Sequence, residues 1–97
     1  MSNTVAFDYY KTRHAAQRQQ QRGIPELTLN LLRLYGHRVY DHRGGCHLIF
    51  NKKAKARVNV ALGKAAAQIN FRSYAVIDAN LPTLITMGHL TQRVWVR

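Results

Sequence analysis

The sequence predicts a single α+β domain over residues 1–97, in which an N-terminal helix pair packs on an antiparallel sheet of about four to five strands. Three observations lead to this class. Two helix-favouring segments, 8–22 and 25–35, each precede a glycine; a Gly-Gly pair signals a hairpin; and two short strand-like segments flank a proline turn. A chain of 97 residues with 46% hydrophobic content can bury one core of modest size.

The first helix is expected from about Asp8 to Arg22, with the Asp8 carboxylate near its start and Gly23 as its stop. The second helix begins at Pro25, a residue suited to the first turn, and ends at Gly36. Apolar residues occupy two faces of this second helix, namely Ile24, Leu27, Leu31, Leu34 and Tyr35 on one and Leu29 and Leu32 on the other. Such a helix is either buried on both sides or binds a partner.

The segment 37–50 predicts a hairpin that turns at Gly44 and Gly45. A turn at these two residues pairs His42 with His47 across the hairpin. The expected faces are then Tyr40, His42, His47 and Ile49 on one side, and Val39, Leu48 and Phe50 on the other. The pattern does not decide which face meets the core.

The stretch 52–70 fits both a strand and a helix pattern, and its alanine content and length favour a helix. Strands are expected over 73–78 and 83–87, joined by a turn at 80–82, with a last strand over 91–96. The segment 3–7 fits either a short strand or a frayed end.

Positive charge is the dominant compositional feature, because 15 Lys and Arg stand against four Asp and Glu and give a net charge of +11. These basic residues run from Lys11 to Arg97, so they belong to the folded body rather than to a tail. Phosphate is the usual partner of such a surface, and RNA is the predicted ligand. With no apolar run of membrane-spanning length, no signal-peptide pattern and a single Cys46, we expect a cytoplasmic protein without a membrane partner.

Metal and carboxylate chemistry find little support in this sequence. It contains neither a phosphate-binding glycine loop nor a dinucleotide fingerprint, and the spacing of its hairpin histidines and Cys46 matches no zinc pattern. A two-metal nuclease needs several acidic ligands, whereas the four acidic residues are scattered. We therefore expect no metal and no cofactor.

Histidine and arginine are the remaining reactive groups. His14, Arg18 and Arg22 are spaced by four and share one helix face, which either binds phosphates or faces solvent. Metal-free RNA cleavage needs a base for the 2′-hydroxyl, an acid for the leaving oxygen and cations at the phosphate. His14 or His42 is the expected base and His89 the expected acid. The candidate catalytic set is His14, Arg18, His42, His89 and Arg93.

Further basic and aromatic residues are candidates for nucleic-acid contact rather than catalysis. Tyrosine rings stack on bases, and the basic run 52–57 either contacts the phosphate backbone or faces solvent. This binding set is Arg13, Arg22, Tyr40, Arg43, Lys52, Lys53, Lys55 and Arg57.

Three stretches together resemble a family of small bacterial proteins of unassigned function that is related to the RelE/ParE toxin superfamily. They are RHAAQR at 13–18 with QRGIP at 21–25, YG at 35–36 with DHRGG at 41–45, and LITMGH at 84–89 with QR at 92–93. The resemblance spans His14 to Arg93. Its motifs include His14 and Arg18 in the first stretch, Asp41, His42 and Gly44 in the second, and Gly88, His89 and Arg93 in the third.

The resemblance implies a compact helix-pair-on-sheet fold and a role in a toxin–antitoxin system. RelE-like members are metal-independent ribonucleases that act on messenger RNA, whereas ParE-like members inhibit DNA gyrase and cleave nothing. An acidic or amphipathic antitoxin usually inactivates such proteins, which implies a protein partner for the leucine-rich helix 25–35. The expected function is a toxin-like, metal-independent endoribonuclease; the alternatives are a nonenzymatic module that binds nucleic acid or inhibits a partner, and a subunit docked on ribosomal RNA.

Overall fold

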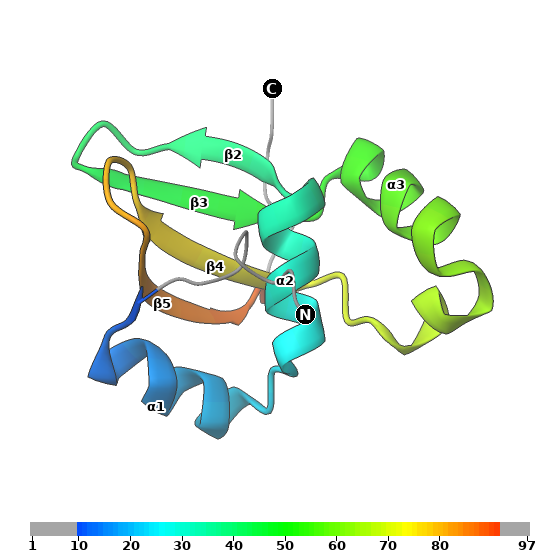
Figure 1. Ribbon diagram of the computed structural model, residues 1–97, viewed down its shortest axis with the longest axis horizontal. Helices are drawn as coiled ribbons and strands as arrows, with labels where there is room; N and C mark the ends of the chain where they lie inside the picture. Colours follow the sequence, from blue (N-terminus) through cyan, green and yellow to red (C-terminus); the bar gives the residue numbers. More distant parts are fainter. Residues whose placement is uncertain (1–9, 92–97) are drawn as a thin grey trace, which may run out of the picture.

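A computed structural model describes residues 10–91 as an α+β domain built on a five-stranded sheet (Figure 1). Its strands lie in the order β1-β5-β4-β3-β2. The elements are β1 (Tyr10–Lys11), α1 (Arg13–Arg22), α2 (Glu26–Tyr35), β2 (His37–Tyr40), β3 (Gly45–Ile49), α3 (Lys52–Leu62), the 3-10 helix η2 (Gly63–Gln68), β4 (Ser73–Asp78) and β5 (Thr83–His89). The sheet is mixed rather than antiparallel throughout, because β1 pairs with β5 in parallel while the other pairs are antiparallel.

The first helix begins later than its sequence suggested. Tyr10 and Lys11 pair with Thr83 and Leu84 as strand β1, and the Thr12 hydroxyl accepts the backbone N–H of Ala15 at 3.0 Å, which caps α1. The predicted start at Asp8 is therefore wrong, and Asp8 itself lies outside the described residues. The predicted stop is confirmed: Gly23 ends α1 with a φ of 62°, a left-handed conformation that glycine adopts without strain.

Helix α2 lies where the sequence predicted it, but its faces differ from the prediction. Thr28, Leu29, Leu31 and Leu32 are all buried along one broad arc, so the two predicted apolar faces are not opposite sides of a buried helix. Leu27 and Leu34, by contrast, each keep 50% of their surface exposed. The helix is thus buried on one side and carries two exposed leucines on the other.

The hairpin between β2 and β3 turns through a longer loop than the two glycines indicated. The Asp41 carboxylate Oδ1 accepts the backbone N–H groups of Arg43 and Gly45 at 2.7 and 3.0 Å, and His42 takes a left-handed φ of 62°. Val39 consequently pairs with His47, so the predicted pairing of His42 with His47 is wrong. The observed register differs from the predicted one by three residues, and an odd shift exchanges the faces: Val39, His47 and Ile49 share one face, and Arg38, Tyr40, Cys46 and Leu48 share the other.

The second half of the chain follows the prediction more closely. A helix over 52–70 is confirmed by α3 and η2, which meet at Gly63. Strand β4 coincides with 73–78, and β5 extends two residues beyond the predicted 83–87. The Asp78 carboxylate stabilises the turn between them by accepting the N–H groups of Asn80 and Leu81. The strands expected over 3–7 and 91–96 fall outside the described residues, except for Thr91.

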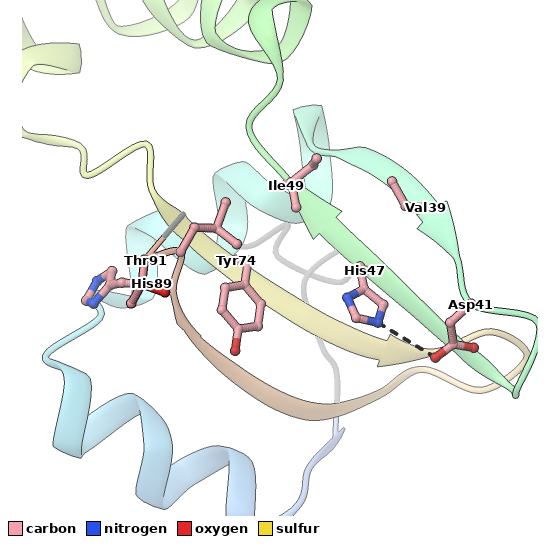
Figure 2. A pocket seen from close by; sticks show the side chains of 8 residues that line it. Val39, Asp41, His47, Ile49, Tyr74, His89 and Thr91 are labelled. Atoms are coloured by element: carbon pink, nitrogen blue, oxygen red, sulfur yellow. Dashed lines mark ion pairs between the residues drawn. The ribbon is translucent and has the colours of Figure 1, made fainter. Parts of the chain in front are cut away.

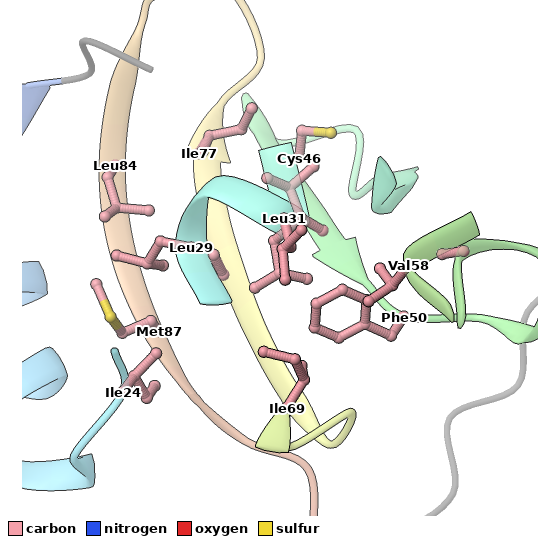
Figure 3. Packing of buried hydrophobic residues seen from close by; sticks show 14 of the residues in the cluster. Ile24, Leu29, Leu31, Cys46, Phe50, Val58, Ile69, Ile77, Leu84 and Met87 are labelled. Atoms are coloured by element: carbon pink, nitrogen blue, oxygen red, sulfur yellow. The ribbon is translucent and has the colours of Figure 1, made fainter. Parts of the chain in front are cut away.

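The core lies between α2 and one face of the sheet, which we call the helix-covered face (Figure 3). Along β3, β4 and β5 this face carries Cys46, Leu48, Ala75, Ile77, Leu84 and Met87. The packing partners from α2 are Leu29 and Leu31, and α3 adds Val58 beside Phe50. Because strand residues alternate, His47, Ile49, Tyr74, Val76 and Thr86 lie on the opposite side, which we call the second face.

Candidate nucleic-acid interface

The second face carries a hollow of about 500 Å³, which we call the large hollow (Figure 2). Strand register places Tyr74 beside Ile49 and His47 beside Val39, so three strands contribute to one surface. The large hollow is lined by Val39, Asp41, His47, Ile49, Tyr74, His89, Leu90 and Thr91. Its walls are therefore mainly apolar, with one carboxylate and two imidazoles at their edges.

A second hollow of about 170 Å³, the small hollow, adjoins the first and is basic. Helix α1 contributes Arg18 and Arg22, which lie one turn apart on the same helix face. The other lining residues are Tyr74, Thr86, Met87, Gly88, His89 and Thr91. Tyr74, His89 and Thr91 line both hollows, so the two form one continuous surface with an apolar part and a cationic part.

The ring of Tyr74 lies directly over the backbone of Gly88 on the neighbouring strand. These two residues are paired across β4 and β5, and a Cβ built on Gly88 would lie 3.1 Å from the Tyr74 Oη and 3.2 Å from two ring carbons. The absence of a side chain at position 88 therefore lets the tyrosine ring lie across β5 toward the small hollow.

Hydrogen bonds hold the start of helix α1 against β5 and so position Arg18 and Arg22 beside the small hollow. The Thr12 hydroxyl donates to the Ile85 carbonyl at 3.0 Å, in addition to capping the helix, and the Thr12 N–H donates to the Leu84 carbonyl at 3.1 Å. Ala15 is completely buried against the core. Since both the start and the inner face of α1 are anchored, Arg18 and Arg22 extend from a rigid element.

A polar cluster joins β1, α1 and α2. Lys11 Nζ donates to Gln19 Oε1 at 2.8 Å and to Glu26 Oε1 at 2.6 Å, while Gln19 Nε2 donates to the same Glu26 oxygen at 3.0 Å. Partial burial acts to raise the pKa of Glu26, but the hydrogen bonds from Gln19 and Lys11 and the charge of Lys11 outweigh it and lower that pKa. The carboxylate therefore serves the packing of α1 against α2.

The other described carboxylates also have structural roles. The backbone N–H groups of Arg43 and Gly45 lower the pKa of Asp41, and Asp78 accepts two N–H groups of the following turn. Asp41 Oδ2 lies 3.7 Å from His47 Nε2, so the hairpin carries a carboxylate beside an imidazole at the rim of the large hollow (Figure 2). Within residues 10–91 no three His, Cys, Asp or Glu side chains gather in a geometry suited to a metal ion.

The single cysteine does not contribute to this surface. Cys46 lies on the helix-covered face with 1% of its surface exposed, and burial raises the pKa of its thiol. A thiol in that setting stays protonated and inaccessible.

Of the five candidate catalytic residues, the structure brings Arg18 and His89 together in the small hollow. His14 is exposed on α1, one turn before Arg18 and outside both hollows. His42 lies in the hairpin loop, near Asp78 at the carboxyl end of β4, which pairs with Gly45. His89 pairs with Ser73 at the amino end of the same strand. Because β4 is six residues long and spans about 17 Å, His42 and His89 do not converge. Arg93 lies outside the described residues.

The candidate binding residues do not gather on one surface. Arg22 lines the small hollow, and Arg13 is exposed at the start of α1. Tyr40 and Arg43 belong to the hairpin, where Tyr40 lies beside the 79–82 turn. Lys53 and Arg57 line a hollow of about 270 Å³ between α3 and β2, together with His37 and Arg38, and Lys52 and Lys55 are exposed nearby on α3.

Two residues of the site, Tyr74 and His47, lay outside the sets proposed from the sequence for catalysis and binding. Tyr74 shares the second face with Ile49 and Gly88 through the strand registers, whereas the apolar residues 75–77 are consecutive and did not indicate its side. His47 was placed on a face with Tyr40 by the wrong hairpin register, and the correct register puts it with Val39 and Ile49. The sides of both residues therefore depended on the strand registers, and that of His47 depended also on the loop geometry.

Among the described residues, the helices are all too short or too polar to cross a membrane.

A comparison with protein-family models finds no match to this chain, and comparisons with curated proteins and with solved structures find none either.

Proposed function

We propose that this chain binds single-stranded RNA across the second face of its sheet and cleaves it without a metal ion, the activity that the sequence resemblance to RelE-like toxins implies. One observation carries the proposal: Arg18, Arg22, Tyr74 and His89 surround a single small hollow. Two arginines suit the oxygens of a phosphodiester, the tyrosine ring suits a base, and the imidazole can transfer a proton. The net charge of +11 attracts the polyanion to this surface.

The cleavage step needs two proton transfers. The 2′-hydroxyl loses its proton to a base and attacks the adjacent phosphorus, and the 5′-oxygen leaves with a proton from an acid. This gives a 2′,3′-cyclic phosphate and a 5′-hydroxyl. His89 is the acid in this scheme, as the sequence suggested. A solvent water accepts the 2′-hydroxyl proton, because the other histidines of the chain, His14, His37, His42 and His47, do not line the small hollow. Arg18 and Arg22 stabilise the charge that builds on the phosphate oxygens.

The test is incubation of the purified protein with single-stranded RNA in excess chelator. The parent protein is expected to release fragments with cyclic phosphate ends. His89→Gln and Arg18→Gln should each slow cleavage by about 10²-fold or more, the usual contribution of a proton-transfer or charge-stabilising group. His14→Gln, an exposed histidine on the same helix as Arg18, is the matched control and should cleave at the parent rate. Cleavage that requires a divalent cation, or equal rates in all three variants, contradicts the proposal.

A nonenzymatic module is the second candidate, because His89 is the one histidine that lines the small hollow. In that case the RNA stays intact in the same assay while salt-sensitive binding still depends on Arg18 and Arg22. A partner-inhibiting role draws support from Leu27 and Leu34, which leave an apolar strip exposed on α2. An acidic or amphipathic antitoxin that binds this strip should lose affinity for Leu27→Gln and Leu34→Gln.

A further inference from the structure

The large hollow is more apolar than phosphate binding requires. Val39, Ile49 and Leu90 form its apolar lining, and the ring of Tyr74 faces it from β4 (Figure 2). Its volume of about 500 Å³ is in the range of pockets that enclose small organic molecules. A sheet face that only contacted a phosphate backbone would not need this apolar recess.

The two hollows together match the chemistry of a nucleotide. A nucleotide joins a flat, largely apolar base to an anionic phosphate through one sugar. Here an apolar hollow adjoins a cationic one, and Tyr74, His89 and Thr91 lie at their junction. The arginines line only the small hollow. The site therefore has a cationic end and an apolar end, as a nucleotide has a phosphate end and a base end.

We propose that the large hollow is a base-binding subsite, which takes the base of the RNA nucleotide whose phosphate lies at Arg18 and Arg22. The inference rests on the proposed RNA binding and extends it by naming what the apolar hollow holds. The base packs between Ile49, Val39 and the tyrosine ring, and its polar edge points to the rim, where Asp41 and His47 lie.

The rim gives this subsite a preference among bases. Asp41 Oδ1 is occupied by the N–H groups of Arg43 and Gly45, while Oδ2 faces His47 at 3.7 Å, too far for a hydrogen bond. An aspartate is ionised at neutral pH, and the two backbone N–H groups lower the pKa of Asp41 further, so Oδ2 only accepts hydrogen bonds. Cytosine and adenine present an amino group to such an acceptor, whereas uracil presents a carbonyl at the equivalent position.

The first experiment compares two strands of equal charge by fluorescence anisotropy: a labelled cytidine hexamer and an abasic ribose-phosphate hexamer. Stacking of one base predicts that the cytidine strand binds about ten-fold more tightly. Val39→Glu places a carboxylate in the hollow from a side chain that is 38% exposed, and Val60→Glu makes the same change on α3 at a position that is 87% exposed. Val39→Glu should abolish the advantage of the cytidine strand, and Val60→Glu should preserve it.

The second experiment changes only the hydrogen-bonding character of the rim. In Asp41→Asn the amide oxygen can still accept the two turn N–H groups, while Nδ2 turns the Oδ2 position into a donor. The parent should prefer the cytidine hexamer to the uridine hexamer by about three-fold to ten-fold, the lower part of what one base contact discriminates, and Asp41→Asn should reverse that order.

The outcomes separate this inference from the proposal beneath it. Equal binding of the cytidine and abasic strands, with Val39→Glu and Val60→Glu equally weakened, overturns the base subsite while RNA binding at the arginines stands. Failure of the parent to bind either strand overturns both. A preference for cytidine that survives Asp41→Asn overturns the role of Asp41.

Discussion

The close approach of Tyr74 to Gly88 gives the sharpest test of how the site is built. A Cβ at position 88 would lie 3.1–3.2 Å from three atoms of the tyrosine side chain. Carbon atoms pack best at about 3.5–4.0 Å, so Gly88→Ala requires the ring to move by about 0.5 Å, and Gly88→Val requires a larger displacement.

Displacing the tyrosine ring should weaken RNA binding more than it lowers the free energy of unfolding. Tyr74 is only partly buried, so its ring can move away from β5 without repacking the core. We expect Gly88→Val to lower the free energy of unfolding by about 1 kcal/mol, at the lower end of overpacking effects, because the contact is at the surface of the sheet. The same variant should lose most of the stacking energy of one base, about 1–3 kcal/mol, which is a five-fold to 150-fold loss of RNA affinity.

The assay combines urea unfolding with anisotropy titration of a labelled RNA hexamer. RNA affinity should fall in the order parent, Gly88→Ala, Gly88→Val, with Gly88→Val close to Tyr74→Ala. In the Tyr74→Ala background, Gly88→Val should have no further effect on affinity, because the group that it displaces is gone. Parent-like affinity in a folded Gly88→Val variant, or full additivity with Tyr74→Ala, would refute the placement of Tyr74 in the RNA site.

Three further predictions follow from the anchoring and charge of α1. Arg18→Gln and Arg22→Gln should each reduce the slope of log affinity against log salt by about 0.7, the single-strand value for one phosphate. Lys64→Gln on η2 is the control and should leave the slope unchanged, so equal slopes for the three variants would argue against the arginine site. Thr12→Ala should lower the free energy of unfolding, measured by urea denaturation, by about 1–2 kcal/mol, because both the helix cap and the hydrogen bond to β5 are lost. Thr12→Ser keeps the hydroxyl and should retain most of the parent stability. The pKa of Glu26 is lowered in the folded state, so its contribution to stability is present above the ordinary pKa of 4.5 and is lost as the pH falls through the folded value. Glu26→Gln should therefore make acid unfolding less steep below that pH, and an unchanged acid limb would contradict the role of the polar cluster.

The sequence predicted the elements whose ends are marked by local chemistry. Gly23 and Gly36 end α1 and α2 as expected, and strand β4 has its predicted limits because a short apolar run between polar turns defines it. The start of α1 was missed because Asp8 and Thr12 are both good capping residues. The choice between them depends on Tyr10 and Lys11 pairing with β5, a contact distant in sequence.

The candidate site was predicted only in part, because the predicted register of the hairpin was wrong. Arg18, Arg22 and His89 were identified from spacing and charge, and they line one hollow. His42 and His47 were paired because two glycines suggested a two-residue turn, whereas the Asp41 side chain builds a longer loop around backbone N–H groups. The resulting three-residue shift in register exchanges the faces of the strand, so local composition alone could not place His47 in the large hollow.

We propose that RNA binds across the second face of the sheet, with its phosphate at α1. The most direct test is to follow backbone amide resonances while a short single-stranded RNA is added. We expect the largest shifts at 18–22 on α1, at His47–Ile49 of β3, at Tyr74–Val76 of β4 and at Thr86–His89 of β5. Shifts confined to the basic 52–57 stretch of α3, with the second face unchanged, would contradict it.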